Sequence, residues 1–147
     1  MAGATQRPEP DDQLVDYVWP YGRKTTGRLR APAGYTVETR NYTEGVITHL
    51  RYPDGSFILL HWGGMIKLPL LDAPEYVLSS AQTRAGRRVR IGVSENADRH
   101  LREDALPPGQ DVFPLNIAYG QVPAERLRLF NAALDSYERI PRKATPN

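Results

Sequence analysis

YPDGSFILLHWGGM, residues 52–65, joins a turn signal to an apolar run with one histidine, one tryptophan and a double glycine. Pro53 suits the second position of a type I turn, and Gly55 suits the left-handed position that follows. A three-residue turn of this kind connects the two strands of a β-hairpin. The stretch therefore predicts a hairpin that pairs residues 46–52 with residues 56–62.

The turn also predicts the register of this hairpin. If Tyr52 lies opposite Ser56, then Leu50 lies opposite Ile58, and one face of the hairpin is almost wholly apolar. We assign that face to the core: Val46, Thr48, Leu50, Ile58, Leu60 and Trp62. A register shifted by one residue would move a histidine onto this face, so the clean apolar pattern favours the first register.

The opposite face of the hairpin carries His49 and His61 as diagonal neighbours, within reach of each other or of one ligand. These two residues, with Arg51 and Trp62 close by, are the candidates for contacts to a ligand or partner. Two histidines do not complete a tetrahedral metal site, and neither an HExxH nor an HxH motif is present. We therefore expect no metal and no cofactor, and the favoured interpretation is two hydrogen-bonded or solvated histidines at the rim of the sheet.

Elsewhere the chain alternates short strand patterns with glycine and proline turns. Residues 14–21 fit a short helix or an edge strand, residues 22–34 a basic connector, and residues 94–106 a loop with a helical turn. The Gly63-Gly64 pair suggests a second hairpin, which would set Ile66, Leu68 and Leu70 beside Phe57 and Leu59. Further strands are predicted at residues 34–42, 65–71, 75–82, 88–93 and 112–119, the second and last as edge candidates because each contains a proline.

The C-terminal region predicts one amphipathic helix. Pro123 suits a first helical turn, and the helix should run to about Arg139. Its apolar stripe comprises Leu127, Phe130, Leu134 and Tyr137. The predicted fold class is α+β: a curved antiparallel sheet of about six or seven strands with this helix packed on it. A half-open barrel is the variant, and residues 56–62 form a central strand.

Composition limits the class of protein. The 147 residues, 40% hydrophobic and 24% charged, suit one globular domain at residues 14–140, with a flexible leader (1–13) and a frayed tail (141–147). The absence of cysteine excludes disulfides, thiolate nucleophiles and cysteine-bound metals. The sequence has neither a signal peptide nor an apolar run of membrane-spanning length. The compartment stays open, since a signal could have been removed.

Arginines cluster in RAGRRVR, at Arg84, Arg87, Arg88 and Arg90. On a hairpin Arg88 and Arg90 would share one face, and such a patch could hold phosphate or an acidic partner. The favoured interpretation is a solvated basic hairpin. Few aromatic residues are interspersed there and the net charge is only +2, so nucleic acid is not favoured. His100 is assigned to a charged surface turn.

No hydrolase elbow and no phosphate-binding loop is present, which favours a non-enzymatic role. The leading hypothesis is a binding module for a protein partner, of adaptor or inhibitor type, suggested by the strand aromatics and the arginines. The first alternative is a small-ligand carrier with a pocket between sheet and helix, near His49, His61 and Trp62. The second is an enzyme that uses the two histidines. The oligomeric state stays open.

Overall fold

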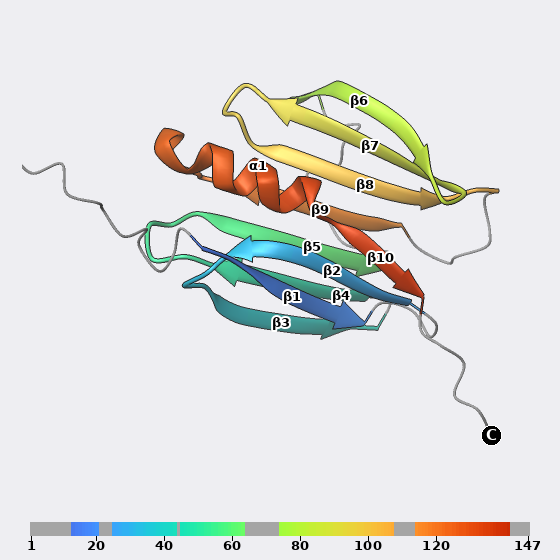
Figure 1. The fold of residues 1–147 in the computed structure, drawn as a ribbon, viewed down its shortest axis with the longest axis horizontal. Helices are drawn as coiled ribbons and strands as arrows, with labels where there is room; N and C mark the ends of the chain where they lie inside the picture. Colours follow the sequence, from blue (N-terminus) through green and yellow to red (C-terminus); the bar gives the residue numbers. More distant parts are fainter. Residues whose placement is uncertain (1–12, 21–24, 44, 64–73, 108–113, 142–147) are drawn as a thin grey trace, which may run out of the picture. The chain divides into compact units, whose positions relative to one another are not determined.

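The computed structural model describes residues 13–20, 25–43, 45–63, 74–107 and 114–141 (Figure 1). Contacts divide the chain into two compact units, of which unit 2 is Thr36–Ala124 and unit 1 combines Met1–Tyr35 with Glu125–Asn147. The predicted leader and tail lie outside the described residues, apart from their inner ends. The single domain expected over residues 14–140 stays a prediction.

Unit 2 contains a seven-stranded antiparallel sheet in the order β3-β4-β5-β9-β8-β7-β6, which is not closed (Figure 1). With the three-stranded sheet of unit 1 and the C-terminal helix, it confirms the predicted α+β class. The strands of this sheet are β3 (Thr36–Tyr42), β4 (Gly45–Arg51), β5 (Phe57–Gly63), β6 (Tyr76–Arg84), β7 (Arg87–Ser94), β8 (Arg99–Ala105) and β9 (Leu115–Gly120).

The hairpin of β4 and β5 has the predicted turn and register. The Gly55 N–H donates to the Tyr52 carbonyl over 3.1 Å, and Gly55 has a φ of +92°, in the region that glycine tolerates best. The Asp54 carboxylate accepts the Ser56 N–H over 2.9 Å, which fixes the turn from inside. Leu50 lies opposite Ile58, as the turn chemistry predicts.

Both faces of β5 are buried at its centre. Ile58 and Leu60 are buried on the predicted core face, and Leu59 and His61 are buried on the opposite face. Trp62, assigned to the core from the sequence, is only half-buried because it lies near the end of the strand. A strand buried on both faces belongs in the interior of a sheet, and β5 does pair on both sides, with β4 and β9.

Unit 1 contains the sheet β1-β2-β10 and the helix α1, which packs against β2. Trp19 lies across Gly27, where an added Cβ would come within 2.4 Å of the indole ring, and it stacks on Tyr137 with ring centroids 6.1 Å apart. Leu29 and Phe130 are fully buried in the same unit. Its elements are β1 (Leu14–Pro20), β2 (Thr25–Pro32), α1 (Leu127–Asp135) and β10 (Glu138–Pro141), and the 3-10 turn η2 (Ala124–Arg126) begins at the last residue of unit 2.

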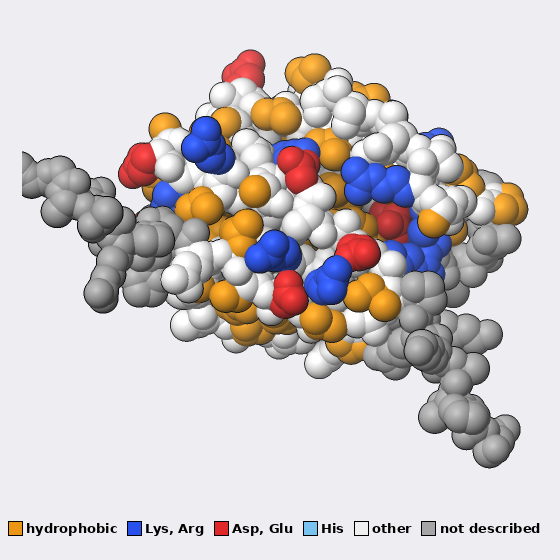
Figure 2. Space-filling model, in the orientation of Figure 1, with side chains coloured by type: hydrophobic (Ala, Val, Ile, Leu, Met, Phe, Trp, Pro, Cys, Tyr) orange, Lys and Arg blue, Asp and Glu red, His pale blue; other side chains and the backbone are white. Residues whose placement is uncertain are grey.

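The exposed charges of the three-stranded sheet compensate one another. Figure 2 shows acidic and basic side chains next to each other on the face in view. Arg28 pairs with Glu138, and Arg30 lies 3.8 Å from Asp16. This arrangement explains why β2 can carry arginines at alternate positions while its other face is buried.

Four elements differ from the sequence-based predictions. The helix ends at Asp135 rather than near Arg139, because Ser136 closes it by donating its backbone N–H to Ala132 and its hydroxyl to Ala133, and β10 follows. The supposed connector at residues 22–34 contains β2, and the supposed loop at residues 94–106 contains β8. The late strand, β9, is interior and not an edge.

The second predicted hairpin is wrong in its pairing. The side of β5 that was expected to receive residues 65–71 pairs instead with β9, with Leu59 opposite Ala118. Residues 65–71 themselves lie outside the described residues. The β6–β7 hairpin, joined at Ala85-Gly86, is confirmed. Across the described ranges, we find no helix with the length and hydrophobicity needed to span a membrane.

Candidate functional site

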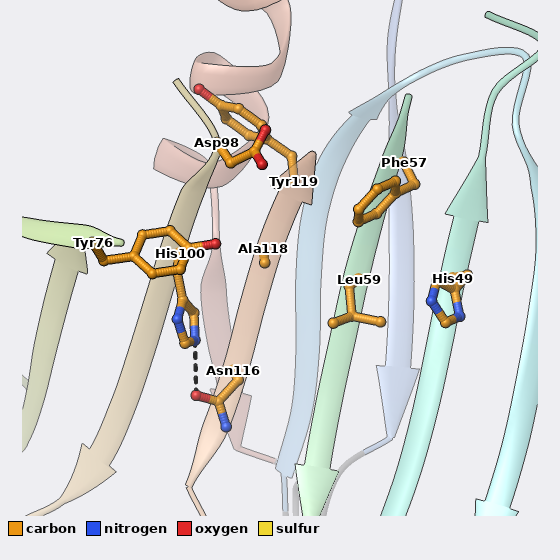
Figure 3. Close-up of a pocket in the computed structure, with 9 residues that line it drawn as sticks. All are labelled: His49, Phe57, Leu59, Tyr76, Asp98, His100, Asn116, Ala118 and Tyr119. Carbon is orange, nitrogen blue, oxygen red and sulfur yellow. Dashed lines mark hydrogen bonds between the residues drawn. The ribbon is translucent and has the colours of Figure 1, made fainter. Parts of the chain in front are cut away.

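The seven-stranded sheet carries a cavity of about 250 Å³ on the face that bears His49 and His100 (Figure 3). Every residue that lines it belongs to unit 2. Strands β4, β5, β6, β8 and β9 contribute to its wall, together with the turn before β8. The lining residues are His49, Phe57, Leu59, Tyr76, Asp98, His100, Asn116, Ala118 and Tyr119.

The floor of the cavity follows one row of the sheet, in which residues of neighbouring strands lie directly opposite each other. The row runs from His49 through Leu59 and Ala118 to His100. Three strand spacings separate the two histidines, or about 14 Å between their backbones. Because Ala118 has the smallest side chain of the four, it leaves open volume between His100 and Leu59.

Phe57 forms the apolar side of the cavity, in the row next to that of Leu59. It lies opposite Gly120, where an added Cβ would come within 2.5 Å of the phenyl ring. The ring therefore occupies the space that any other residue at position 120 would need. On its other side the His49 ring meets it edge to face, with centroids 6.3 Å apart.

Asp98 and Tyr76 supply polar groups at the opposite wall (Figure 3). A tight turn before β8 places Asp98: its backbone N–H donates to the Ser94 hydroxyl over 3.1 Å. Burial raises the pKa of the Asp98 carboxyl, although the Gln121 N–H that it accepts acts in the opposite direction. Burial, and then the charges of Asp98 and Glu75, raise the pKa of the Tyr76 hydroxyl.

Asn116 links the cavity to a third histidine, His61, in the next row of the same face. The His100 Nε2 donates to Asn116 Oδ1 over 2.9 Å, and Asn116 Nδ2 donates to His61 Nδ1 over 3.3 Å. All three residues are buried: the exposed fraction is 1% for His100, 3% for Asn116 and 4% for His61. This arrangement assigns the proton of the neutral His61 ring to Nε2, since Nδ1 is the acceptor.

Two histidines of this face have a lowered pKa. For His61 the cause is burial, followed by the positive charge of Arg102. For His49 the cause is burial and the charges of Arg51 and Arg40, partly opposed by Glu38. Both rings are therefore neutral near pH 7 and act as hydrogen-bonding groups.

The sequence-predicted site residues are only partly brought together. His49 and His61 share one face as diagonal neighbours, as predicted. Among the described residues, those that line the cavity include His49 but neither His61 nor Trp62. Trp62 lies on the opposite face, across from Leu115, and Arg51 is exposed in an ion pair with Glu38 at 2.9 Å.

The predicted basic patch is divided between two faces. Arg88 and Arg90 share the histidine face, where both approach the Asp104 carboxylate. Arg87 lies on the other face in a buried ion pair with Glu103. Arg84 is the residue of β6 directly opposite Arg87 in the strand register.

Apart from His49, the sequence analysis did not identify the residues that line the cavity. His100, assigned to a charged surface turn, is almost fully buried in β8. Its neighbours in the site, Ala118 and Asn116, come from β9, a strand that pairs with β8 across a connection of nine residues, 106–114. Leu101 and Glu103 are the buried positions that alternate with polar residues in β8. Because Glu103 is charged, the sequence did not show the apolar alternation that predicts a strand.

In the part of the chain that the structure describes, no three histidine, aspartate or glutamate side chains gather as a metal site would require. No family model matches the chain, and no curated protein and no solved structure does either.

Proposed function

We propose that this protein binds a small organic molecule in the cavity over β5, β8 and β9. The observation that supports the proposal is the cavity itself, which combines an apolar floor with a few convergent polar groups. At about 250 Å³ it lies just below the usual range of small-molecule pockets, about 300–1,000 Å³. A compact ligand, with one ring and a short chain, suits this volume.

The roles of the lining residues follow from their chemistry. Phe57, Leu59 and Ala118 would contact the apolar body of the ligand. Tyr76 and Asp98 would orient it through hydrogen bonds, because a few fixed polar groups set the orientation of a ligand in an apolar pocket. The protein-partner role expected from the sequence stays a prediction, and the cavity favours the small-ligand role over it.

A histidine-dependent enzyme is the second candidate. Groups with a shifted pKa that gather in one cavity are candidate catalytic groups, and Asp98 and Tyr76 meet that description beside His100. Binding is the simpler proposal because it needs only the cavity, whereas catalysis would need a substrate placed against these groups.

The proposed function is tested by titrating the isotope-labelled protein with single-ring compounds: indole, 4-phenylbutan-1-ol, 4-phenylbutanoate and phenyl phosphate. We expect at least one compound to shift the backbone amide signals of Leu59 and His100. Ala118→Leu should abolish these shifts, because the larger side chain fills the cavity from its floor. Ala81→Leu, at an exposed position of β6, is the matched control and should leave binding unchanged.

Two results would contradict the proposal. The first is that none of the four compounds shifts the cavity signals at millimolar concentration. The second is that Ala118→Leu, shown by circular dichroism to be folded, binds as well as the wild-type protein.

A further inference from the structure

Two arginines lie beyond the cavity on the same face of the sheet, Arg102 one row along and Arg88 two rows along. Arg102 is directly opposite Asn116, a cavity residue, and Arg88 is directly opposite Asp104. Adjacent rows on one face are about 7 Å apart along the strands, so a short chain reaches from the cavity floor to Arg102.

The charges of this group do not balance. The Asp104 carboxylate lies 3.0 Å from Arg102 Nε, 3.3 Å from an Arg90 nitrogen and 3.7 Å from an Arg88 nitrogen. Arg88 and Arg102 alone carry two positive charges against the single negative charge of Asp104. In the described ranges no other carboxylate pairs with either of them. The Arg102 side chain is 22% exposed and that of Arg88 is 51% exposed, so a solute can reach both.

His61 adds a hydrogen-bond donor to the same row. It lies opposite Asn116 on β5, as Arg102 does on β8. Asn116 occupies Nδ1 of the ring, so the proton is on Nε2, and this buried atom has no hydrogen-bond partner within the described part of the chain. A buried donor without a partner is costly, and an anion is the group that would satisfy it beside a guanidinium.

We propose that Arg88, Arg102 and His61 form a subsite for the anionic head group of the ligand, a carboxylate or a phosphate. This inference rests on the proposed ligand cavity and names the class of its ligand: a compact organic acid or phosphate ester with an apolar body. Guanidinium groups bind both head groups through paired N–H donors. Burial and then the charge of Arg102 lower the pKa of His61, which agrees with a neutral N–H donor close to that charge.

The test compares two probes that share a body and differ in the head group, 4-phenylbutanoate and 4-phenylbutan-1-ol. We expect the acid to bind the full chain at least about tenfold more tightly, as a charge-assisted hydrogen bond implies. Arg102→Gln should remove this preference and leave the affinity for the alcohol unchanged. Arg128→Gln, at an exposed position of α1, makes the same change in charge and should retain the preference.

Arg88→Gln provides a second variant if Arg102→Gln does not fold, because the Arg88 side chain is half exposed. A comparison of phenyl phosphate with 4-phenylbutanoate distinguishes phosphate from carboxylate as the preferred head group. Equal affinity for the acid and the alcohol in the wild-type protein would overturn the subsite and leave the cavity proposal intact. A preference that survives the arginine substitutions would overturn it too.

If neither the acid nor the alcohol binds, the cavity proposal is wrong and inorganic phosphate tests the subsite alone. A phosphate-dependent shift of the His61 imidazole nitrogen signals, lost in Arg102→Gln, would support an anion site. Absence of that shift would overturn it.

Discussion

Arg87 on β7 and Glu103 on β8 form an ion pair in the buried face of the seven-stranded sheet, with 2.5 Å between Nε and Oε1 and side chains only 9% and 5% exposed. The attraction between these charges offsets the cost of removing both from water. Removing one partner would leave the other charge buried without it.

We therefore expect Glu103→Gln to lower the free energy of unfolding by about 3–5 kcal/mol, measured by urea denaturation. Glu38→Gln is the matched control, since its ion pair with Arg51 is exposed and should contribute at most about 1 kcal/mol. The double variant Arg87→Met/Glu103→Leu should recover most of the lost stability. Equal losses of unfolding free energy in Glu103→Gln and Glu38→Gln would show that the buried pair contributes no more to stability than the exposed pair.

Asn116 is expected to set the protonated nitrogen of His61. Asn116→Leu keeps the volume of the side chain and removes both hydrogen bonds, at a cost of about 1–3 kcal/mol. In the imidazole nitrogen spectrum, His61 should be protonated at Nε2 in the wild-type protein and should become a mixture of tautomers in the variant. Asn41→Leu, at an exposed position of β3, should change neither observable. A His61 spectrum unaffected by Asn116→Leu would contradict the assigned hydrogen bond.

Stability should fall in mild acid. Burial and Arg102 lower the pKa of His61 in the folded protein below its ordinary value of 6.5, so below about pH 6.5 the unfolded chain binds protons more readily than the folded one. The free energy of unfolding should therefore decrease as pH falls from 6.5 toward the folded-state pKa.

Urea denaturation between about pH 7 and pH 5 measures this slope, and His61→Gln should reduce it. Asp98→Asn is the companion variant, because the raised pKa of Asp98 has the opposite sign: its contribution is present at low pH and lost as pH rises through the folded-state pKa. An identical slope in the wild-type protein and His61→Gln would rule out His61 as its source.

The effect of a side chain at position 27 on stability is expected to depend on the Trp19 ring. A methyl group at position 27 would come within 2.4 Å of the indole ring, and overpacking of this kind costs about 1–3 kcal/mol. Gly27→Ala should therefore lower the thermal midpoint followed by tryptophan fluorescence. Trp19→Leu should remove most of that penalty in the double variant. Equal penalties with and without the indole would place its cause elsewhere.

The hairpin was predictable because its information is local. Pro53 and Gly55 specify the turn, the turn specifies the register, and the register puts His49 and His61 on one face. The helix was predictable for the same reason, from the spacing of Phe130 and Leu134, although its end was not. Ser136 closes it through contacts that include the Arg30 N–H, which lies in a distant strand.

The cavity was not predictable because it depends on the pairing of β9 with a distant strand, β5, as well as with its neighbour in the chain, β8. Ala118 meets Leu59 on one side and His100 on the other, and no local pattern indicates either neighbour. The strand that carries His100 was concealed by polar residues on both faces, of which Glu103 is buried in an ion pair with its diagonal neighbour Arg87. Conversely, β2 was concealed by glycine, proline and arginine, residues that usually mark a connector.

The discontinuity of unit 1 has a consequence for synthesis. Strand β2 pairs with β10 through Arg28 and Glu138, which are 110 residues apart, whereas unit 2 is one continuous segment between them. On the ribosome, β3 to β9 therefore emerge while β2 still lacks both its second neighbour and the helix that packs on it. Until residues 127–141 follow, the face of Leu29 and Ala31 is open to other chains, so a stall late in translation would leave it exposed to aggregation.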